Sequence, residues 1–249
     1  MSNFRLISLG LLAAVVVFVA SSASATEPPK KCGGKVTTTP NYCVAGLQLE
    51  NSKGETISEK VEGTNGEALL KATIGGVTSE IKCSKGKSKG TIENGTGGTA
   101  GKSTATIVFE ACKLVAPTNC KLTAADEEEI ETASLKGELT LLTGGRVGDK
   151  LESKTSVFAT ISIEGKEVSC VIAEVGKPKA FAVTGSQLCE VDSNNTEAEK
   201  EAEKHKLICK ASGSSLEAGQ NNPATMSNEA TTTLSGAKAH ALWSIKEHT

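Results

Sequence analysis

The chain has 249 residues, of which 38% are hydrophobic and 22% are charged, and its formal net charge at pH 7 is −2. Such a near-neutral balance lacks the excess positive charge that nucleic-acid-binding proteins carry, and a 3% aromatic content provides few stacking surfaces for bases or sugars. We therefore expect no nucleic-acid partner.

Residues 1–25 predict a secretory signal peptide. One positive charge, Arg5, precedes an apolar run over 6–20, and Ala23-Ser24-Ala25 fits the small-x-small rule for cleavage. The alternative is an uncleaved membrane anchor, for which the apolar run is short. Residues 26–249 hold no further stretch apolar enough to cross a bilayer. We predict a protein that is secreted to the extracellular space or the cell envelope, with no membrane span in the mature chain.

The eight cysteines all follow the predicted cleavage site, and an even number in an exported chain predicts disulfide bonds. Spacing alone does not determine the connectivity. Pairing neighbours across loops gives Cys32–Cys43, Cys112–Cys120 and Cys189–Cys209, and this choice leaves Cys83–Cys170. Because the chain contains no C-x-x-C motif, we expect the cysteines to hold no metal, and no sequence motif implies a cofactor.

Apolar and polar residues alternate along several short segments of the first half of the chain, which predicts β-strands. Gly75-Gly76 lies between two such segments and predicts a tight hairpin turn. Two polar, glycine-containing segments, 51–66 and 85–102, predict turn regions, the second with a short edge strand near 91–92. The predicted strands are 44–49, 68–74, 77–83, 103–112 and 134–143.

The second half of the chain repeats this organisation. Glu164-Gly165-Lys166 predicts a second hairpin, whose outgoing strand contains Cys170 as the earlier one contains Cys83. This loose repeat suggests two similar β-modules, at about 44–143 and 151–249, within one secreted β domain at 26–249. The predicted strands are 156–163, 167–175, 179–184 and one or two within 231–246.

One segment, residues 196–206, has the local features of a helix. Thr196 and Glu199 occupy the two positions of a capping box, and opposite charges recur three residues apart, as in Glu201 and Lys204. The segment has almost no apolar face, so we predict a short exposed helical insert.

Candidate chemical sites are few. The acidic segment 126–131 has oxygen ligands for a cation such as Ca²⁺, and the alternative is a solvated acidic loop. A Ser-His-Asp hydrolase would need one of three histidines, His205, His240 or His248, as its base, yet no G-x-S-x-G or H-E-x-x-H motif is present. We therefore assign no catalytic, cofactor-binding or metal-binding residues.

Several short segments carry a resemblance to a known group of proteins. They are the strand 106–112 with the following Cys120, the segment 130–139, Val168-Ser-Cys170, Val183-Thr-Gly185 and Leu234-Ser-Gly236. These segments carry a resemblance, which covers about half of the chain, to a set of secreted, cysteine-containing, β-rich actinobacterial proteins of unknown function. The resemblance implies export and a β fold and implies no activity.

Together these features predict an all-β fold, an antiparallel β-sandwich or open barrel held by disulfides, with one helical insert. The functional hypothesis is a non-enzymatic binding or structural protein, bacterial, whose partner is a cell-envelope component or an extracellular ligand. The alternative is a secreted hydrolase or hydrolase inhibitor that uses loop carboxylates. Two carboxylates that converge in a cleft, one with a pKa raised by burial, would favour this alternative.

Overall fold

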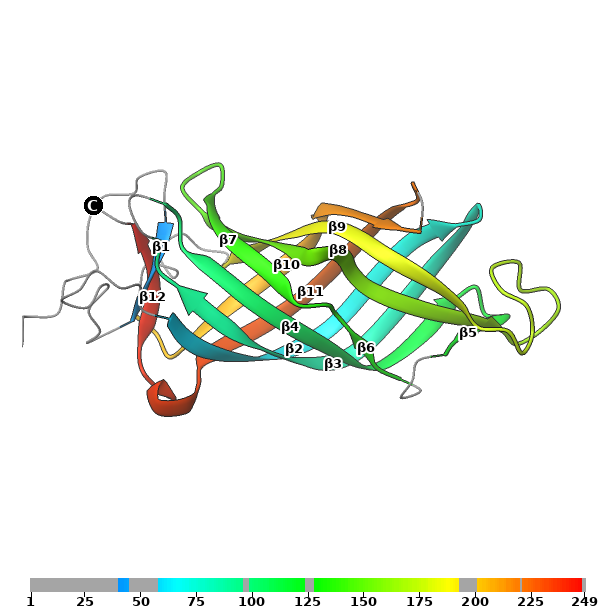
Figure 1. Cartoon of the computed structure of the whole chain (residues 1–249), viewed down its shortest axis with the longest axis horizontal. Coiled ribbons are helices and arrows are strands. Elements are labelled where there is room, and N and C mark those ends of the chain that lie inside the picture. The colour runs from blue at the N-terminus through cyan, green and yellow to red at the C-terminus, as the bar shows by residue number, and fades with distance from the viewer. Residues whose placement is uncertain are drawn as a thin grey trace, which may run out of the picture.

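The computed structural model describes residues 40–44, 58–95, 99–123, 128–192, 201–219 and 221–247. Nearly all of their regular structure is β-strand, with one short 3₁₀ helix, η1 (Figure 1). The elements are β1 (Pro40–Val44), β2 (Ser58–Ile74), β3 (Val77–Glu93), β4 (Lys102–Ala116), β5 (Cys120–Leu122), β6 (Ile130–Glu131), β7 (Leu135–Leu141), β8 (Val147–Gly165), β9 (Lys179–Val191), β10 (Lys204–Ala218), β11 (Pro223–Leu234), η1 (Gly236–Lys238) and β12 (Trp243–Glu247).

Eight of these strands form a closed barrel. They pair antiparallel in the order β3-β2-β11-β10-β9-β8-β7-β4, and β4 pairs again with β3, so no edge remains (Figure 1). Two short strands add to the outside of this order, β5 on β8 and β6 on β4. The first predicted module, at about 44–143, contains β2, β3, β4 and β7, and β8 to β11 follow it in the chain. The relation between the two halves as similar modules stays a prediction.

The predicted all-β, antiparallel, disulfide-bonded fold is confirmed, and two finer expectations are wrong. The sheet closes on itself, so it is neither a sandwich nor an open barrel. The described part of the predicted helix, residues 201–206, is not helical, and residues 196–200 lie outside the described residues. Ala202 exchanges two backbone hydrogen bonds with Trp243, and Lys204–Lys206 begin β10 opposite β11. Tertiary strand pairing therefore overrides the local helix propensity.

The strands change phase or register about halfway along the barrel. In β2 the inward positions change phase between Asn65 and Ala68, across Gly66 and Glu67, which have no register partners in β3. Ala111 in β4 and Ser156 in β8 have φ angles of 52° and 74°, and the register of β8 against β9 shifts around Ser156, as in a β-bulge. The buried apolar side chains of the protein form two clusters, a larger and a smaller one.

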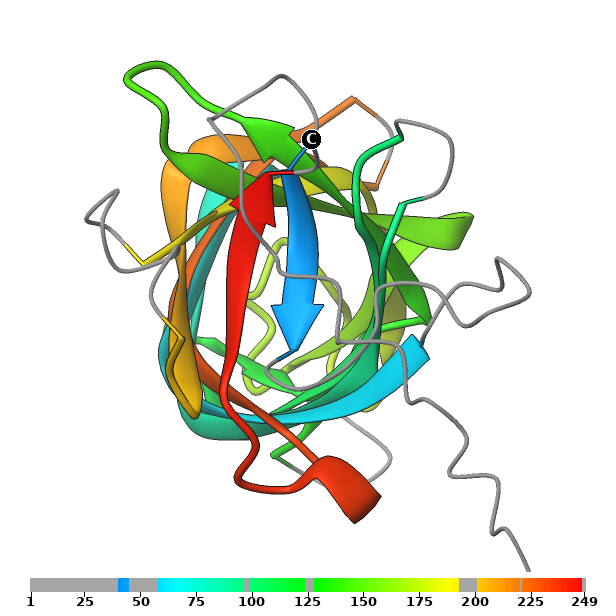
Figure 2. The same cartoon turned by 90° about the vertical axis from the view of Figure 1, so that its left-hand side faces the viewer.

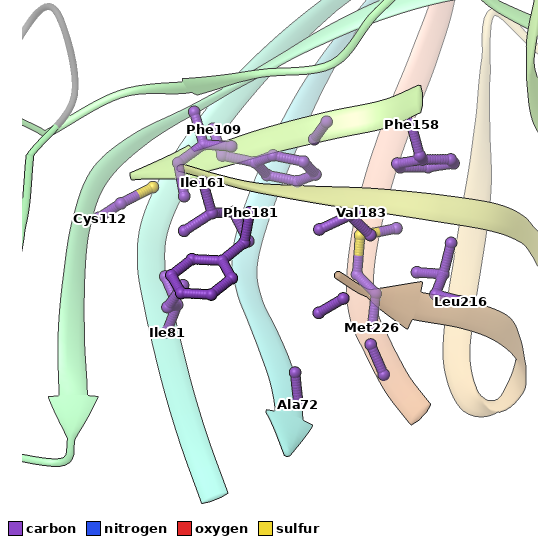
Figure 3. Close-up of a cluster of buried hydrophobic side chains, with 14 of the residues drawn as sticks. Ala72, Ile81, Phe109, Cys112, Phe158, Ile161, Phe181, Val183, Leu216 and Met226 are labelled. Atoms are coloured by element: carbon purple, nitrogen blue, oxygen red, sulfur yellow. The ribbon is translucent and has the colours of Figure 1, made fainter. Parts of the chain in front are cut away.

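The larger cluster fills one half of the barrel. Phenylalanine and aliphatic side chains from opposite walls meet there, including Phe109, Phe158, Phe181 and Met226 (Figure 3). Each strand contributes every second residue, and the alternate residues are exposed on the outer surface, as the burial of β7 shows. Burial of this apolar surface is the main force that closes the sheet.

The smaller cluster is covered by a two-stranded ribbon formed by β1 and β12. These strands come from opposite ends of the chain and pair antiparallel from Pro40–Glu247 to Val44–Trp243. Figure 2 looks into the barrel from this end and shows the ribbon standing across the opening. Its inward side chains Tyr42, Trp243 and Ile245 pack against residues such as Val61 and Leu139.

Three disulfides are formed among the described residues: Cys83–Cys112, Cys120–Cys170 and Cys189–Cys209. Cys189–Cys209 agrees with our prediction. The predicted bonds Cys83–Cys170 and Cys112–Cys120 are wrong, because Cys83 and Cys112 are directly opposite each other in the β3–β4 ladder. Cys43 is also disulfide-bonded. Cys32, its predicted partner, lies outside the described residues.

Cys170 lies in a loop and not in the strand that we predicted. The hairpin expected at Glu164-Gly165-Lys166 does not form, because β8 continues to Gly165 and the chain returns only at Lys179. The bond to Cys120, in β5, attaches this loop to the barrel. The first predicted hairpin is confirmed, with Gly75 and Gly76 at φ angles of 58° and 79°. No helix in the described ranges is long and apolar enough to span a membrane.

Candidate functional site

A cavity of about 80 Å³ lies inside the barrel, between the β1–β12 ribbon and the larger apolar cluster. The ribbon contributes Tyr42, Trp243 and Ile245 to its wall, and the barrel strands contribute a mixture of apolar and polar side chains. The polar side chains distinguish this cavity from an ordinary packing defect, since voids in a core are normally apolar. Those that are almost fully buried are Asn65, Ser103, Asp149 and Asn228.

Asp149, in β8, is the charged residue of this wall with the most buried side chain, and its carboxyl group has two donors. The hydroxyl of Ser103 donates to Asp149 Oδ2 at 2.8 Å, and the hydroxyl of Tyr42 donates to the same oxygen at 3.4 Å. The other oxygen, Oδ1, has no hydrogen-bond partner in the described part of the chain. The oxygen Oδ2 thus accepts hydrogen bonds from the protein, and Oδ1 is available to a further donor.

Gly137 makes this arrangement possible. It lies in β7 between β4 and β8, with Ser103 and Leu151 as its register partners. A Cβ atom at Gly137 would be 2.0 Å from Ser103 Oγ and 2.3 Å from Asp149 Oδ1. Only glycine leaves room for the two polar side chains to meet across the intervening strand.

Burial changes the acidity of both groups. It raises the pKa of Asp149 from 3.8 to about 6, against the opposing effect of the hydrogen bonds from Ser103 and Tyr42. Burial and the nearby Asp149 carboxylate raise the pKa of Tyr42 well above its usual value, so the phenol remains a donor. At neutral pH the cavity wall therefore carries a buried negative charge.

Two asparagines supply further polar atoms without partners. Asn65, in β2, has neither its amide oxygen nor its amide nitrogen hydrogen-bonded to the described protein, and Asn228, in β11, lacks a partner for its oxygen. Both side chains are less than 8% exposed and line the cavity. A buried polar group without a partner costs about 1–3 kcal/mol, so partners inside the cavity would be strongly favoured.

A buried histidine fastens the ribbon beside this cavity. His205 Nδ1 is 2.5 Å from Asp192 Oδ2, and His205 Nε2 is 2.7 Å from the backbone oxygen of Trp243. Both ring nitrogens therefore lie within hydrogen-bonding distance of an oxygen atom. Because Nε2 is bonded to a carbonyl and not to a serine hydroxyl, this His–Asp pair lacks the geometry of a Ser-His-Asp triad.

The other sequence-predicted candidates do not line the cavity in the described part of the chain. His240 is on the surface, 2.6 Å from Glu203, and His248 is outside the described residues. In the acidic segment, residues 126 and 127 are outside the described residues, and Glu131 pairs with β4 in the short strand β6. Within the described ranges no three His, Cys, Asp or Glu side chains gather as a metal site would need.

A larger open groove of about 750 Å³ crosses the outer wall of β2, β3 and β11 beside η1. Its charged side chains have both signs, among them Glu62, Lys89 and Glu203. Its described lining residues include none of the buried side-chain atoms that lack a partner. The groove therefore has a weaker signature of a specific site than the internal cavity.

Searches of protein-family models, of curated proteins and of solved structures found no match to this chain. The site therefore has to be interpreted from its own geometry.

Sequence reasoning missed Asp149, Asn65 and Asn228. Asp149 lay between predicted strands, and Asn65 in a predicted turn region. The sequence did contain a signal for Asp149, which alternates with the apolar residues Val147 and Leu151. Asp149 therefore occupies an inward position of a strand. A polar residue in an apolar phase is an indication of a buried polar site.

Proposed function

We propose that this protein is a non-enzymatic, extracytoplasmic binding protein that holds a small polar molecule inside its barrel. The observation that carries the proposal is the set of buried side-chain atoms without partners, from Asn65, Asp149 and Asn228, around one cavity. A protein with a purely structural role gains nothing from such atoms, since each of them reduces stability unless a guest pairs with it.

The size of the cavity limits the guest. Water occupies about 30 Å³ per molecule in the liquid, so a cavity of about 80 Å³ holds roughly two or three waters or a molecule of similar volume. Of the two partners that we predicted, this favours a small extracellular ligand over a polymer of the cell envelope. Export is supported by residues 1–25 and by the disulfides, which are typical of oxidising compartments.

The rival hypothesis, carboxylate-based hydrolysis, needs two acidic side chains at one site. Asp149 has the raised pKa that this hypothesis requires. Among the described residues that line the cavity, however, Asp149 is the one carboxylic acid. The binding hypothesis uses the unpartnered oxygens of Asn65, Asp149 and Asn228, whereas the rival uses only the carboxyl group.

The test is a thermal-unfolding screen of the oxidised mature protein against small neutral, cationic and anionic molecules, each of at most about four non-hydrogen atoms. At least one compound should raise the unfolding temperature in a saturable manner. The same compound should lose its effect on N65A and N228A, whose apolar side chains remove the hydrogen bonds, and should keep it on the surface control Glu152→Gln. Absence of any saturable stabilisation would refute the proposed function.

A further inference from the structure

We infer that the guest is a small primary amine, bound as its ammonium ion between Asp149 and the asparagine amides. The inference rests on the proposed function and specifies its ligand. Three of the four unpartnered atoms are oxygens that accept hydrogen bonds: Asp149 Oδ1, Asn65 Oδ1 and Asn228 Oδ1. An ammonium group donates three hydrogen bonds and accepts none, so its chemistry is complementary to this set.

Charge selects the ammonium ion over a neutral donor. The described cavity wall has a carboxylate that is 4% exposed, and no basic side chain is hydrogen-bonded or ion-paired to it. An isolated ionised carboxylate is costly to bury, whereas a carboxylate paired with a cation and hydrogen-bonded is tolerated. A cation in the cavity therefore removes a cost that an alcohol or an amide of the same size leaves in place.

The groups that surround the Asp149 carboxylate come from several strands. Ser103 in β4 and Gly137 in β7 lie against the carboxyl group. Cys189 in β9 is the register partner of Asp149, and its sulfur is disulfide-bonded. Tyr42, from β1, is the titratable group in contact with it, and its pKa is raised well above 10. His205, on β10, has both ring nitrogens bonded to Asp192 and Trp243.

The apolar part of the wall fits a short hydrocarbon chain. Val61, Ile107 and Trp243 line the same cavity as the polar atoms. With room for the equivalent of roughly two or three waters, the amine has about three non-hydrogen atoms, as in ethylammonium. Longer amines would have to displace the ribbon.

The experiment compares ethylammonium chloride with ethanol, which has the same length and lacks the charge. Each is titrated into the oxidised mature protein at constant ionic strength, and binding is followed by NMR of the backbone and side-chain amides. At pH 7.5, ethylammonium should bind at least tenfold more tightly than ethanol, with saturable shifts at residues of the cavity wall. At pH 5 only about a tenth of the Asp149 side chains are ionised. The affinity for ethylammonium should therefore be about tenfold lower than at pH 7.5.

The variant D149N keeps an acceptor for Ser103 and Tyr42 and should bind the two compounds equally at both pH values. Glu152→Gln, on the outer face of the same strand, should behave as the wild type. Equal binding of both compounds to the wild type would overturn the ammonium inference and leave the binding function standing. If neither binds while another compound of the thermal screen does, the ammonium inference alone fails; if that screen is also negative, both fail.

Discussion

Ionisation of Asp149 should make the folded protein less stable as the pH rises from 4 to 7.5. Burial gives this carboxyl group a pKa of about 6 in the folded state, against 3.8 ordinarily. The folded state therefore binds the proton more tightly than the unfolded chain. The resulting stabilisation is fully present below about pH 3.8 and is lost as the pH rises through 6.

The magnitude follows from the gap between the two pKa values. A difference of 2.2, from 6 minus 3.8, corresponds to about 3 kcal/mol at ~1.4 kcal/mol per pKa unit. Typical domains have a free energy of unfolding of roughly 5–15 kcal/mol, so this contribution is a large part of the total. A single buried carboxyl group thus controls much of the acid–base dependence of stability in this range.

The assay is urea unfolding of the oxidised protein at pH 4.5 and 7.5, with the fluorescence of Trp243, the one tryptophan, as the probe. Ionisation of Asp149 should lower the free energy of unfolding of the wild type between pH 4.5 and pH 7.5. This contribution should be absent from D149N. Exposed carboxylates shift stability in the opposite direction, because the lysines beside Glu110 and Glu152 lower their pKa values. They are unchanged in D149N, so the difference between the two proteins isolates Asp149. Identical pH dependence of wild type and D149N would refute the reasoning.

Three further predictions concern the framework of the site. Replacing both Cys120 and Cys170 with alanine should lower the free energy of unfolding, measured with urea, by about 4 kcal/mol, because this disulfide closes a loop of 50 residues. Replacing both Cys189 and Cys209 should lower it by about 3 kcal/mol, because that loop has 20 residues. The reverse order would contradict the chain-entropy argument. Gly137→Ala should cost about 1–3 kcal/mol by the same method, and adding Ser103→Ala should recover part of it, because the new Cβ collides with Ser103 Oγ. His205→Asn should speed amide exchange in β1 and β12 at least about tenfold while β3 and β4 stay protected, since the ribbon loses its bond at Trp243; unchanged exchange in the ribbon would show that His205 does not fasten it.

The sequence predicted the parts of the fold that depend on local alternation. The hairpin at Gly75-Gly76 and the strand around Ile107 and Phe109 are where periodicity placed them. Local reasoning failed where strands are rich in glycine and polar residues, as in 58–66 and 85–93. In 85–93 the inward positions are mostly small, including Gly86 and Gly90, and the outward ones include three lysines, so no apolar alternation marks the strand.

Local sequence patterns did not predict the closure of the barrel or the connectivity of the cysteines, for a related reason. Both depend on which distant strands become neighbours, and strand pairing is decided by the whole sheet. Cys83 and Cys112 are 29 residues apart in sequence and have Cα atoms 3.9 Å apart. Nothing in their spacing distinguishes this pair from the loop-closing pair that we expected. The helix prediction at 196–206 failed in the same way at Ala202, whose partner Trp243 is 41 residues further along the chain.

The ribbon is both the cover of the cavity and part of its wall, and this links ligand binding to ribbon docking. Tyr42 donates to Asp149 from the ribbon, and the backbone oxygen of Trp243 is bonded to His205. A guest that needs the closed wall therefore stabilises the docked ribbon, by RT ln(1 + [L]/Kd) in excess ligand. An ammonium guest should also favour ionised Asp149, so the pH dependence of unfolding described above should flatten in saturating ethylammonium. Ethanol should leave this dependence unchanged, and an equal effect of both compounds would show that the guest does not interact with the carboxylate.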